Sequence, residues 1–243
     1  MTILVVGASG ATGRQLIEQL LIQGHNVKAV ARSPEKLPES LRNNDLLQII
    51  SASILELSDK EMSEHVFDCH SIASCLGHNL TWKGVYGEPR KLVTDATHRL
   101  CEAITANNLK QPVKYVLMNT TGNSNRDLNE PISFAQKCVI GLIRLLLPPH
   151  VDNEKAADFL RTQIGQNNEF IEWTVVRPDG LTNEDKVTDY DIHPSPTKSA
   201  IFNAGKVSRI NVGHFMANLI NDDDLWNKWK GQMPVIYKKS SVD

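Results

Sequence analysis

The sequence predicts an α/β fold with a doubly wound parallel sheet in three α/β/α layers. Short apolar runs alternate with helical patterns through the first half of the chain, as in repeated strand–helix units. The first run, Thr2–Val6, is β-branched or apolar throughout, which is typical of a strand buried on both faces. A glycine-rich turn follows this run directly and leads into a helical pattern.

The other elements are expected in a regular order. Helix Thr12–Gln23 follows the turn, because its apolar residues recur on one face and Gly24 stands where a helix ends. Leu92–Asn107 carries a similar apolar stripe. A third helix is expected at Asn153–Ile164, with Asp152 available as its N-terminal cap. Further strands are expected at Val27–Ala31, Leu46–Ile50, Ser71–Leu76, Val113–Met118 and Phe170–Val176.

Two further patterns lie near the C-terminus. His214–Met216 falls on a helical pattern with Leu219 and Ile220, and we expect its apolar members in the core rather than in a pocket. Trp226 and Trp229 are expected to anchor the last helix to the sheet.

Two long excursions depart from a minimal doubly wound domain. Gly122–Val151 and Pro178–Lys206 both follow predicted strands, and such excursions build substrate pockets at the carboxyl ends of the strands. A surface cover or a dimer contact is the alternative for each. No repeat, low-complexity tract or linker divides the chain, so we expect one domain over residues 1–243, with these small excursions on the substrate side.

Composition excludes several classes of protein. With 41% hydrophobic and 22% charged residues the chain is globular rather than disordered. A net charge of −2 provides no basic face for nucleic acid or an anionic membrane. The four cysteines lack zinc-site spacing, so no metal is expected. The apolar run Cys138–Pro149 contains Arg144 and is too short for a span of about 20 residues. With no targeting pattern at its start, the chain is expected to be cytoplasmic.

The glycine-rich turn predicts a dinucleotide-binding, Rossmann-type site. Gly7 permits an unusual φ, Gly10 lets the backbone approach a pyrophosphate, and Gly13 lets the helix pack against the strand. The N–H groups of the first helical turn then face the anion. Ser9 and Thr12 add hydroxyl donors. A turn that serves only to reverse the chain is the alternative.

The end of the second predicted strand favours NADP(H) over NAD(H). A carboxylate there would bind the ribose 2′-hydroxyl of NAD, but the chain reads Ala31-Arg32-Ser33. Arg32 is able to pair with a 2′-phosphate, and Ser33 to donate a further hydrogen bond. The alternative is that Arg32 is simply solvated at a strand end.

Several motifs resemble those of one protein family. They are VVGASGATG and the residues after it in Val5–Pro38, then Cys75–Gly77, Asn119–Gly122, Trp173–Pro178 and Val207–Met216. Together they resemble the atypical short-chain dehydrogenase/reductases, in particular the biliverdin-IXβ reductase/flavin reductase and NmrA-like group. The resemblance implies a Rossmann fold and a nicotinamide cofactor.

The resemblance also implies roles for individual residues. The pyrophosphate would lie on Gly7, Ser9, Gly10, Ala11, Thr12 and Gly13, and the 2′-phosphate on Arg32 and Ser33. The bridge between adenosine and nicotinamide would lie over Cys75, Leu76 and Gly77, and the nicotinamide end near Thr120, Thr121, Arg177 and Pro178. Family members carry Gly-Asp after the third strand. Since this chain reads Ser51–Ile54 there, any adenine contact falls to Ser53 or to backbone at Ser53 and Ile54.

The usual catalytic pair of the wider superfamily is missing. No tyrosine is followed by lysine in a Tyr-x-x-x-Lys pattern, which argues against an ordinary alcohol dehydrogenase or sugar epimerase. The bilin-reducing branch has a histidine where this chain has Asp179-Gly180, which argues against strict bilin specificity. The candidate catalytic residues are Thr121, Asp179 and His78, which follow three converging strands. A solvated loop position is the alternative for His78.

These observations favour an NADP(H)-dependent oxidoreductase that transfers hydride to a flat conjugated small-molecule acceptor such as a flavin, a quinone or a similar molecule. Two rivals stay open: a non-catalytic NADP(H) sensor of the NmrA-like type, and an epimerase or isomerase that retains its nicotinamide. The chain is expected to be a monomer or a homodimer. Ile140–Leu147 could line the acceptor pocket, form a dimer face or rest on a membrane surface, and the sequence does not decide among these.

Overall fold

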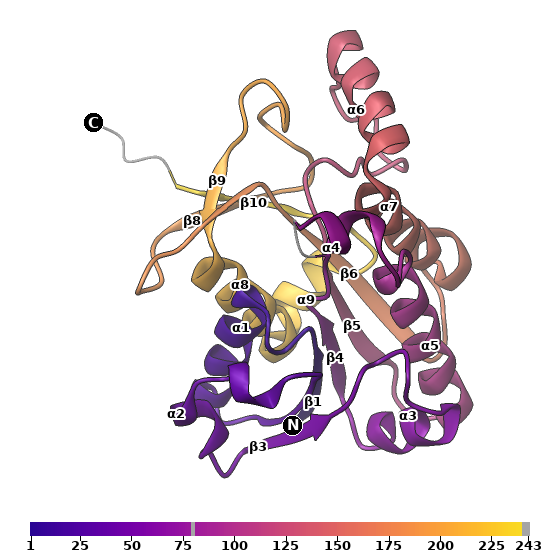
Figure 1. Cartoon of the computed structure of the whole chain (residues 1–243), viewed down its shortest axis with the longest axis vertical. Helices are drawn as coiled ribbons and strands as arrows, with labels where there is room; N and C mark the ends of the chain where they lie inside the picture. Colours follow the sequence, from indigo (N-terminus) through magenta and orange to yellow (C-terminus); the bar gives the residue numbers. More distant parts are fainter. Residues whose placement is uncertain (79–80, 240–243) are drawn as a thin grey trace.

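A computed structural model describes residues 1–78 and 81–239, apart from the side chain of Lys83 (Figure 1). The main sheet of this part of the chain has the strand order β3-β2-β1-β4-β5-β6-β10-β8. Its strands are parallel except β8, which pairs antiparallel with β10. Their bounds are β1 Thr2–Val6, β2 Asn26–Ala31, β3 Leu47–Ser51, β4 Ser71–Ser74, β5 Val113–Met118, β6 Ile171–Pro178, β8 Tyr190–His193 and β10 Val235–Lys238.

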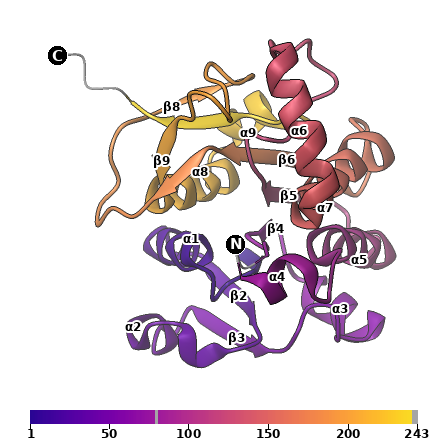
Figure 2. The same ribbon diagram turned by 45° about the horizontal axis from the view of Figure 1, so that its top comes forward.

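Helices cover both faces of this sheet (Figure 2). One face packs against α1 (Ala11–Ile22), α8 (Arg209–Asn221) and α9 (Asp223–Trp229). The other face packs against α3 (Asp59–Val66), α5 (Leu92–Asn107) and α7 (Pro148–Phe159). Short elements complete the described chain: η1 Pro34–Lys36, α2 Glu39–Arg42, α4 Trp82–Tyr86, α6 Phe134–Leu146, the π turn η2 Leu160–Ile164, and the paired strands β7 Gly180–Thr182 and β9 Lys206–Ser208.

The first strand shows why the sheet is covered on both sides. Successive side chains of a strand point to opposite faces. Ile3 and Val5 enter the core beneath α1 and α8, whereas Leu4 and Val6 enter the core beneath α3 and α5. The continuous apolar run therefore fills two cores at once, and the predicted doubly wound fold is confirmed.

Helices α1 and α8 approach each other backbone to backbone. A Cβ built on Gly213 of α8 would lie 2.8 Å from the backbone nitrogen of Leu16 on α1. The absence of a side chain at Gly213 thus sets the distance between the two helices. Since α1 follows the glycine-rich turn, α8 also supports the position of that turn.

The helix expected at Asn153–Ile164 begins earlier. α7 starts at Pro148, because proline is well suited to the first turn of a helix, where its missing N–H costs nothing. Asp152 therefore lies within α7, and the prediction that it caps this helix is wrong. Its carboxylate instead accepts hydrogen bonds from the backbone N–H groups of Val93 (2.8 Å) and Thr94 (2.9 Å), at the start of α5.

The two excursions are more ordered than the sequence indicated. The first contains α6 and the start of α7, and the second contains β7, β8 and the beginning of β9. Strand β10 was not predicted, and it joins β8 to the main sheet. No helix in residues 1–78 or 81–239 has both the length and the apolar character needed to cross a bilayer.

The expected roles of the C-terminal residues are confirmed. The core between α8 and the sheet contains the apolar residues of this helix, among them Phe215, Met216, Leu219 and Ile220. The indole N–H of Trp226 donates to the carboxylate of Glu172 on β6, and Trp229 is buried in the same core. This short helix is thus held to the sheet both by apolar packing and by one polar contact.

Candidate functional site

A cleft of about 700 Å³ opens beside the carboxyl ends of β1, β2, β3 and β4. Parallel strands end there together, and doubly wound folds bind their ligands at this edge. The predicted cofactor residues that line it are Gly7, Ser9, Gly10, Ala11, Arg32, Ser53, Ile54, Cys75, Leu76 and Gly77. The structure therefore brings together residues from four separate segments, each of which follows a strand.

The glycine-rich turn has the geometry of an anion cradle. Gly7 adopts a positive φ of 74°, and a Cβ there would lie 2.5 Å from the carbonyl carbon of Cys75. A Cβ on Gly13 would lie 2.2 Å from the carbonyl oxygen of Gly7. α1 starts without a side-chain cap and without an acidic residue in its first turn, so its N–H groups and positive dipole end are open to an anion.

Two members of the predicted pyrophosphate set do not line the cleft. Thr12 is buried in α1, and Gly13 serves the contact with Gly7 described above. Both stabilise the turn from the side that faces away from the cleft. Ser9, Gly10 and Ala11 are the residues that face the cleft.

The end of β2 carries two cations rather than one. Arg32 is exposed and lines the cleft, and so does Lys36 from the short helix η1. Ser33 precedes η1 as its N-cap and does not line the cleft. Lys36 was missed in the sequence because no fixed spacing from the turn marks it. Its signal was Pro34, which fixes the start of a short turn that directs the chain back to the cleft.

The segment after β3 and the loop before α5 form the facing walls. Ser53 and Ile54 line the cleft as expected, together with Ala52, Leu55 and Glu56. Glu88 and Pro89, which were not predicted, line the wall next to Leu92. A narrower extension of about 200 Å³ continues from Arg32 and Gly77 past His78 to α4.

The structure does not place Arg177 on the cleft. Its guanidinium is fully buried and lies 2.7 Å from a carboxylate oxygen of Glu130. It also donates to the carbonyl oxygens of Met233 (2.7 Å) and Asn123 (2.8 Å). These partners use its hydrogen bonds within the protein, so the side chain ties the first excursion to β6 and to the segment before β10.

Thr121 and Asp179 lie next to each other at the ends of β5 and β6. The Thr121 N–H donates to the carbonyl oxygen of Pro178 (3.0 Å), and Asp179 accepts a 2.7 Å hydrogen bond from the Gly205 N–H. Burial raises the pKa of Asp179 above its ordinary value and outweighs the opposing hydrogen bonds from Gly205 and the Thr121 side chain. The Thr121 hydroxyl is buried. Neither they nor Thr120 and Pro178 line the cleft.

His78 lies apart from that pair. Its imidazole Nε2 is 2.7 Å from a carboxylate oxygen of Asp152, and both side chains are buried. Burial alone would raise the pKa of Asp152, but hydrogen bonds from His78, Thr94 and the start of α5 outweigh it and lower that pKa. His78 is thus held against α7, whereas the sequence allowed a solvated loop histidine or a proton donor beside Thr121 and Asp179.

The sequence profile of a family described as NAD(P)H-binding matches residues 7–223. The chain belongs to this NAD(P)H-binding family. The match begins at the glycine-rich turn and extends to α9.

This NAD(P)H-binding protein is similar in sequence to a plant protein and in fold to bacterial proteins. It is 27% identical over 195 residues to the chloroplastic protein At2g34460 of Arabidopsis thaliana, a match that spans 80% of this chain and 64% of the plant protein. Its fold resembles a short-chain dehydrogenase/reductase of Veillonella parvula in complex with NADP (TM-score 0.71, 14% identity, 100% and 96% of the two chains). It also resembles a candidate NADH-flavin reductase of Streptococcus pneumoniae (TM-score 0.65, 16% identity, 98% of each chain).

The residues of the NAD(P)H-binding protein fit a dinucleotide. Side chains at Gly7 and Gly13 would collide with the backbone of the cradle, and the uncapped start of α1 suits a pyrophosphate. Ser9, Gly10 and Ala11 line the cleft at the start of α1, and Arg32 lines it at the end of β2.

One further polar residue beside Asp179 was missed by sequence reasoning. Tyr237 on β10 packs its ring against Gly205, and burial together with the nearby Asp179 raises the pKa of its hydroxyl. The Nζ of Lys198 lies 5.8 Å from the centroid of this ring. No local motif could have revealed this group, because its members come from β6, the second excursion and β10.

Proposed function

We propose that this NAD(P)H-binding protein is an NADP(H)-dependent oxidoreductase whose acceptor is a flat, conjugated molecule such as a flavin or a quinone. The pair of cations Arg32 and Lys36 on one side of the cleft carries the cofactor preference. A guanidinium and an ammonium attract the extra phosphate that distinguishes NADP(H) from NAD(H). The NADP bound by the Veillonella parvula protein of similar fold supports this preference.

The cofactor supplies the hydride when bound. The chain's own groups hold the pyrophosphate at the start of α1 and donate a proton to the acceptor. Asp179 keeps its proton to a higher pH than an ordinary carboxyl group, and we assign it as the proton donor. The buried hydroxyl of Thr121, next to Asp179, is assigned to orient the acceptor oxygen. His78 receives no role in proton transfer, because Asp152 holds its imidazole.

A flavin or quinone acceptor agrees with the missing Tyr-x-x-x-Lys pair. Such acceptors are able to take protons from solvent, so a tyrosine of lowered pKa is not required. Both tyrosines near the second excursion have raised pKa values instead: burial raises that of Tyr190 to about 12, and burial with Asp179 raises that of Tyr237. The similarity in fold to a candidate NADH-flavin reductase supports the same class of acceptor.

One observation favours a second candidate, a non-catalytic NADP(H) sensor. Thr120, Thr121 and Pro178, which the reductase hypothesis places near the nicotinamide, do not line the cleft. A protein whose nicotinamide end is inaccessible to an acceptor would bind the cofactor without oxidising or reducing it.

Calorimetry and kinetics separate these candidates. Titration with NADPH and NADH tests the cofactor preference, and we expect clearly tighter binding of NADPH. Oxidation of NADPH is then followed with a panel of flavins, quinones and bilins, and we expect turnover with at least one flavin or quinone. Equal affinity for the two cofactors would contradict the preference. Tight NADPH binding without turnover of any acceptor would replace the reductase with the sensor.

A further inference from the structure

Helix α6 is amphipathic in the reverse sense to an ordinary surface helix. It stands out from the rest of the molecule (Figure 1). Gln136, Ile140 and Arg144 recur every four residues and therefore share one side. This side faces the protein: Gln136 and Ile140 are the buried residues of the helix. A surface helix normally turns an apolar stripe inward, whereas this inward stripe has one apolar member.

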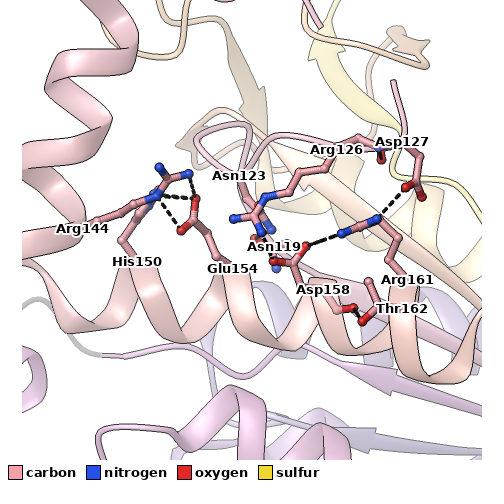
Figure 3. A network of polar contacts seen from close by, with 11 residues as sticks. Asn119, Asn123, Arg126, Asp127, Arg144, His150, Glu154, Asp158, Arg161 and Thr162 are labelled. Carbon is pink, nitrogen blue, oxygen red and sulfur yellow. Dashed lines mark hydrogen bonds and ion pairs between the residues drawn. The ribbon is translucent and has the colours of Figure 1, made fainter. Parts of the chain in front are cut away.

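Polar contacts hold that inward side. The Ser199 hydroxyl donates to the side-chain oxygen of Gln136 (2.9 Å). Arg144 points at α7 and makes a bidentate pair with Glu154, with Nη2 to Oε1 and Nε to Oε2 both 2.8 Å (Figure 3). Because these contacts orient the helix, its apolar side chains are directed away from the protein.

The outward side carries large apolar residues in solvent. Phe134 is 82% exposed, Leu145 is 78% exposed, and Leu142 and Leu146 are each more than half exposed. Leaving this much apolar area in water on one helix is unfavourable, and such patches mark interaction sites.

Exposed apolar side chains also occur in two segments that contact α6. Trp82 on α4 is 82% exposed, and the Tyr86 hydroxyl of the same helix donates to the carbonyl oxygen of Leu146 (3.0 Å). Phe202 is also exposed, in the loop that Ser199 joins to α6. We call this set the α6 surface; it consists of Trp82, Phe134, Leu142, Leu145, Leu146 and Phe202.

The charges around α6 indicate what covers it. No acidic residue occurs from Pro131 to Val151, and Lys137 is exposed, whereas Arg144 is paired with Glu154 of α7. A symmetric contact between two copies of α6 would give Lys137 no carboxylate partner from the other helix. Phospholipid headgroups provide anionic oxygens above an apolar phase, which suits both Lys137 and the leucines.

We infer that the α6 surface binds a lipid bilayer, with α6 lying in the plane of the interface. Tryptophan, phenylalanine and leucine combined with lysine or arginine are typical of interfacial helices. With 13 residues α6 is too short to span the bilayer. The net charge of −2 does not oppose this binding, because burial of the apolar side chains drives it, with Lys137 as the local cation, rather than a basic face of the whole protein.

Vesicle co-sedimentation tests the inference without using the cofactor. Vesicles of phosphatidylcholine alone and with phosphatidylglycerol are the probes, and we expect the wild-type protein to bind both and to bind the anionic vesicles more tightly. The double substitution Leu142→Glu and Leu145→Glu should lower partitioning at least about tenfold. Lys137→Gln should reduce only the advantage of the anionic vesicles.

Ile22→Glu is the matched control, because Ile22 is 72% exposed on α1, outside the α6 surface. This variant should bind vesicles as the wild type does, and all variants should keep the wild-type circular dichroism and NADPH affinity. Absence of wild-type binding to both vesicles would overturn the inference, as would equal losses from Ile22→Glu and the double substitution. A wild-type dimer that the double substitution dissociates would assign the surface to a second copy and overturn it too.

Discussion

The segment that forms the cleft and the segment from β5 to β6 are held together in different ways. In the first, glycines at positions 7 and 13 let backbone meet backbone, and apolar side chains fill both cores. In the second, ion pairs hold the first excursion: Arg126 pairs with Asp158 and Arg161 with Asp127 (Figure 3), and Arg177 of β6 pairs with Glu130. The glycines of the first segment stand in one short motif of the sequence, whereas the ion pairs of the second join residues of separate elements.

The largest expected effect comes from the buried ion pair of the second segment. Glu130→Gln leaves the fully buried Arg177 without its carboxylate, so we expect the free energy of unfolding to fall by about 3–5 kcal/mol. Urea denaturation measures it. The control is Glu64→Gln, which breaks an exposed pair with Lys60 on α3 and should change stability by less than about 1 kcal/mol. Equal midpoints for the two variants would show that the ion pair does not stabilise this segment.

A methyl group added to the glycine-rich turn is expected to have the next largest effect. In Gly13→Ala the new Cβ would meet the Gly7 carbonyl oxygen at 2.2 Å, so the turn must shift. We expect a loss of about 1–3 kcal/mol in stability and at least about tenfold weaker NADPH binding by calorimetry. Gly141→Ala on α6 meets nothing within 4 Å and should be neutral or stabilising by up to about 1 kcal/mol. Similar results for the two variants would refute the role assigned to Gly13.

Removal of the guanidinium at the end of β2 tests whether the cleft distinguishes NADPH from NADH. Arg32→Ala should weaken NADPH binding roughly ten- to hundredfold, the usual range for a charged hydrogen bond to phosphate. NADH binding should change little. Lys60→Ala, which removes an exposed cation on α3, is the control and should leave both affinities unchanged. A parallel loss for NADPH and NADH would show that Arg32 does not distinguish them.

The smallest expected effect is the pH dependence of the stability that the ion pair between α6 and α7 contributes. Burial opposes ionisation of Glu154, but His150 and Arg144 outweigh it and lower its pKa from 4.5 to about 2. The wild type should therefore be more stable than Glu154→Gln by about 1 kcal/mol above pH 4.5. This difference should shrink as the pH falls below 4.5 and vanish near pH 2. Thermal melts across this range would detect it, and a difference independent of pH would contradict the assignment.

The sequence predicted the fold of the N-terminal half well because its signals are local. The spacing of Gly7, Gly10 and Gly13 and the polarity of Ala31–Ser33 all lie within one strand–turn–helix–strand unit. Lys36 was missed because a short turn, rather than a periodic pattern, brings it to the cleft.

The other half resisted prediction because its contacts are long-range. Arg177 reads as a strand-end arginine suited to a ligand, but Glu130 lies 47 residues earlier and binds it in the core. Asp152 reads as a cap for its own helix and caps α5 instead, 58 residues away at Thr94. α6 was not predicted as a helix, since an apolar run without polar alternation indicates burial, whereas its large side chains face solvent.

The close approach of Gly213 to Leu16 has a consequence for the order in which the protein becomes complete during synthesis. The first helix is made long before the backbone that covers it, which begins at residue 209. A nascent chain halted before that point would contain every residue of the glycine-rich turn while Leu16 and Leu20 still lacked this cover. Cofactor affinity should therefore arise only after α8 has left the ribosome.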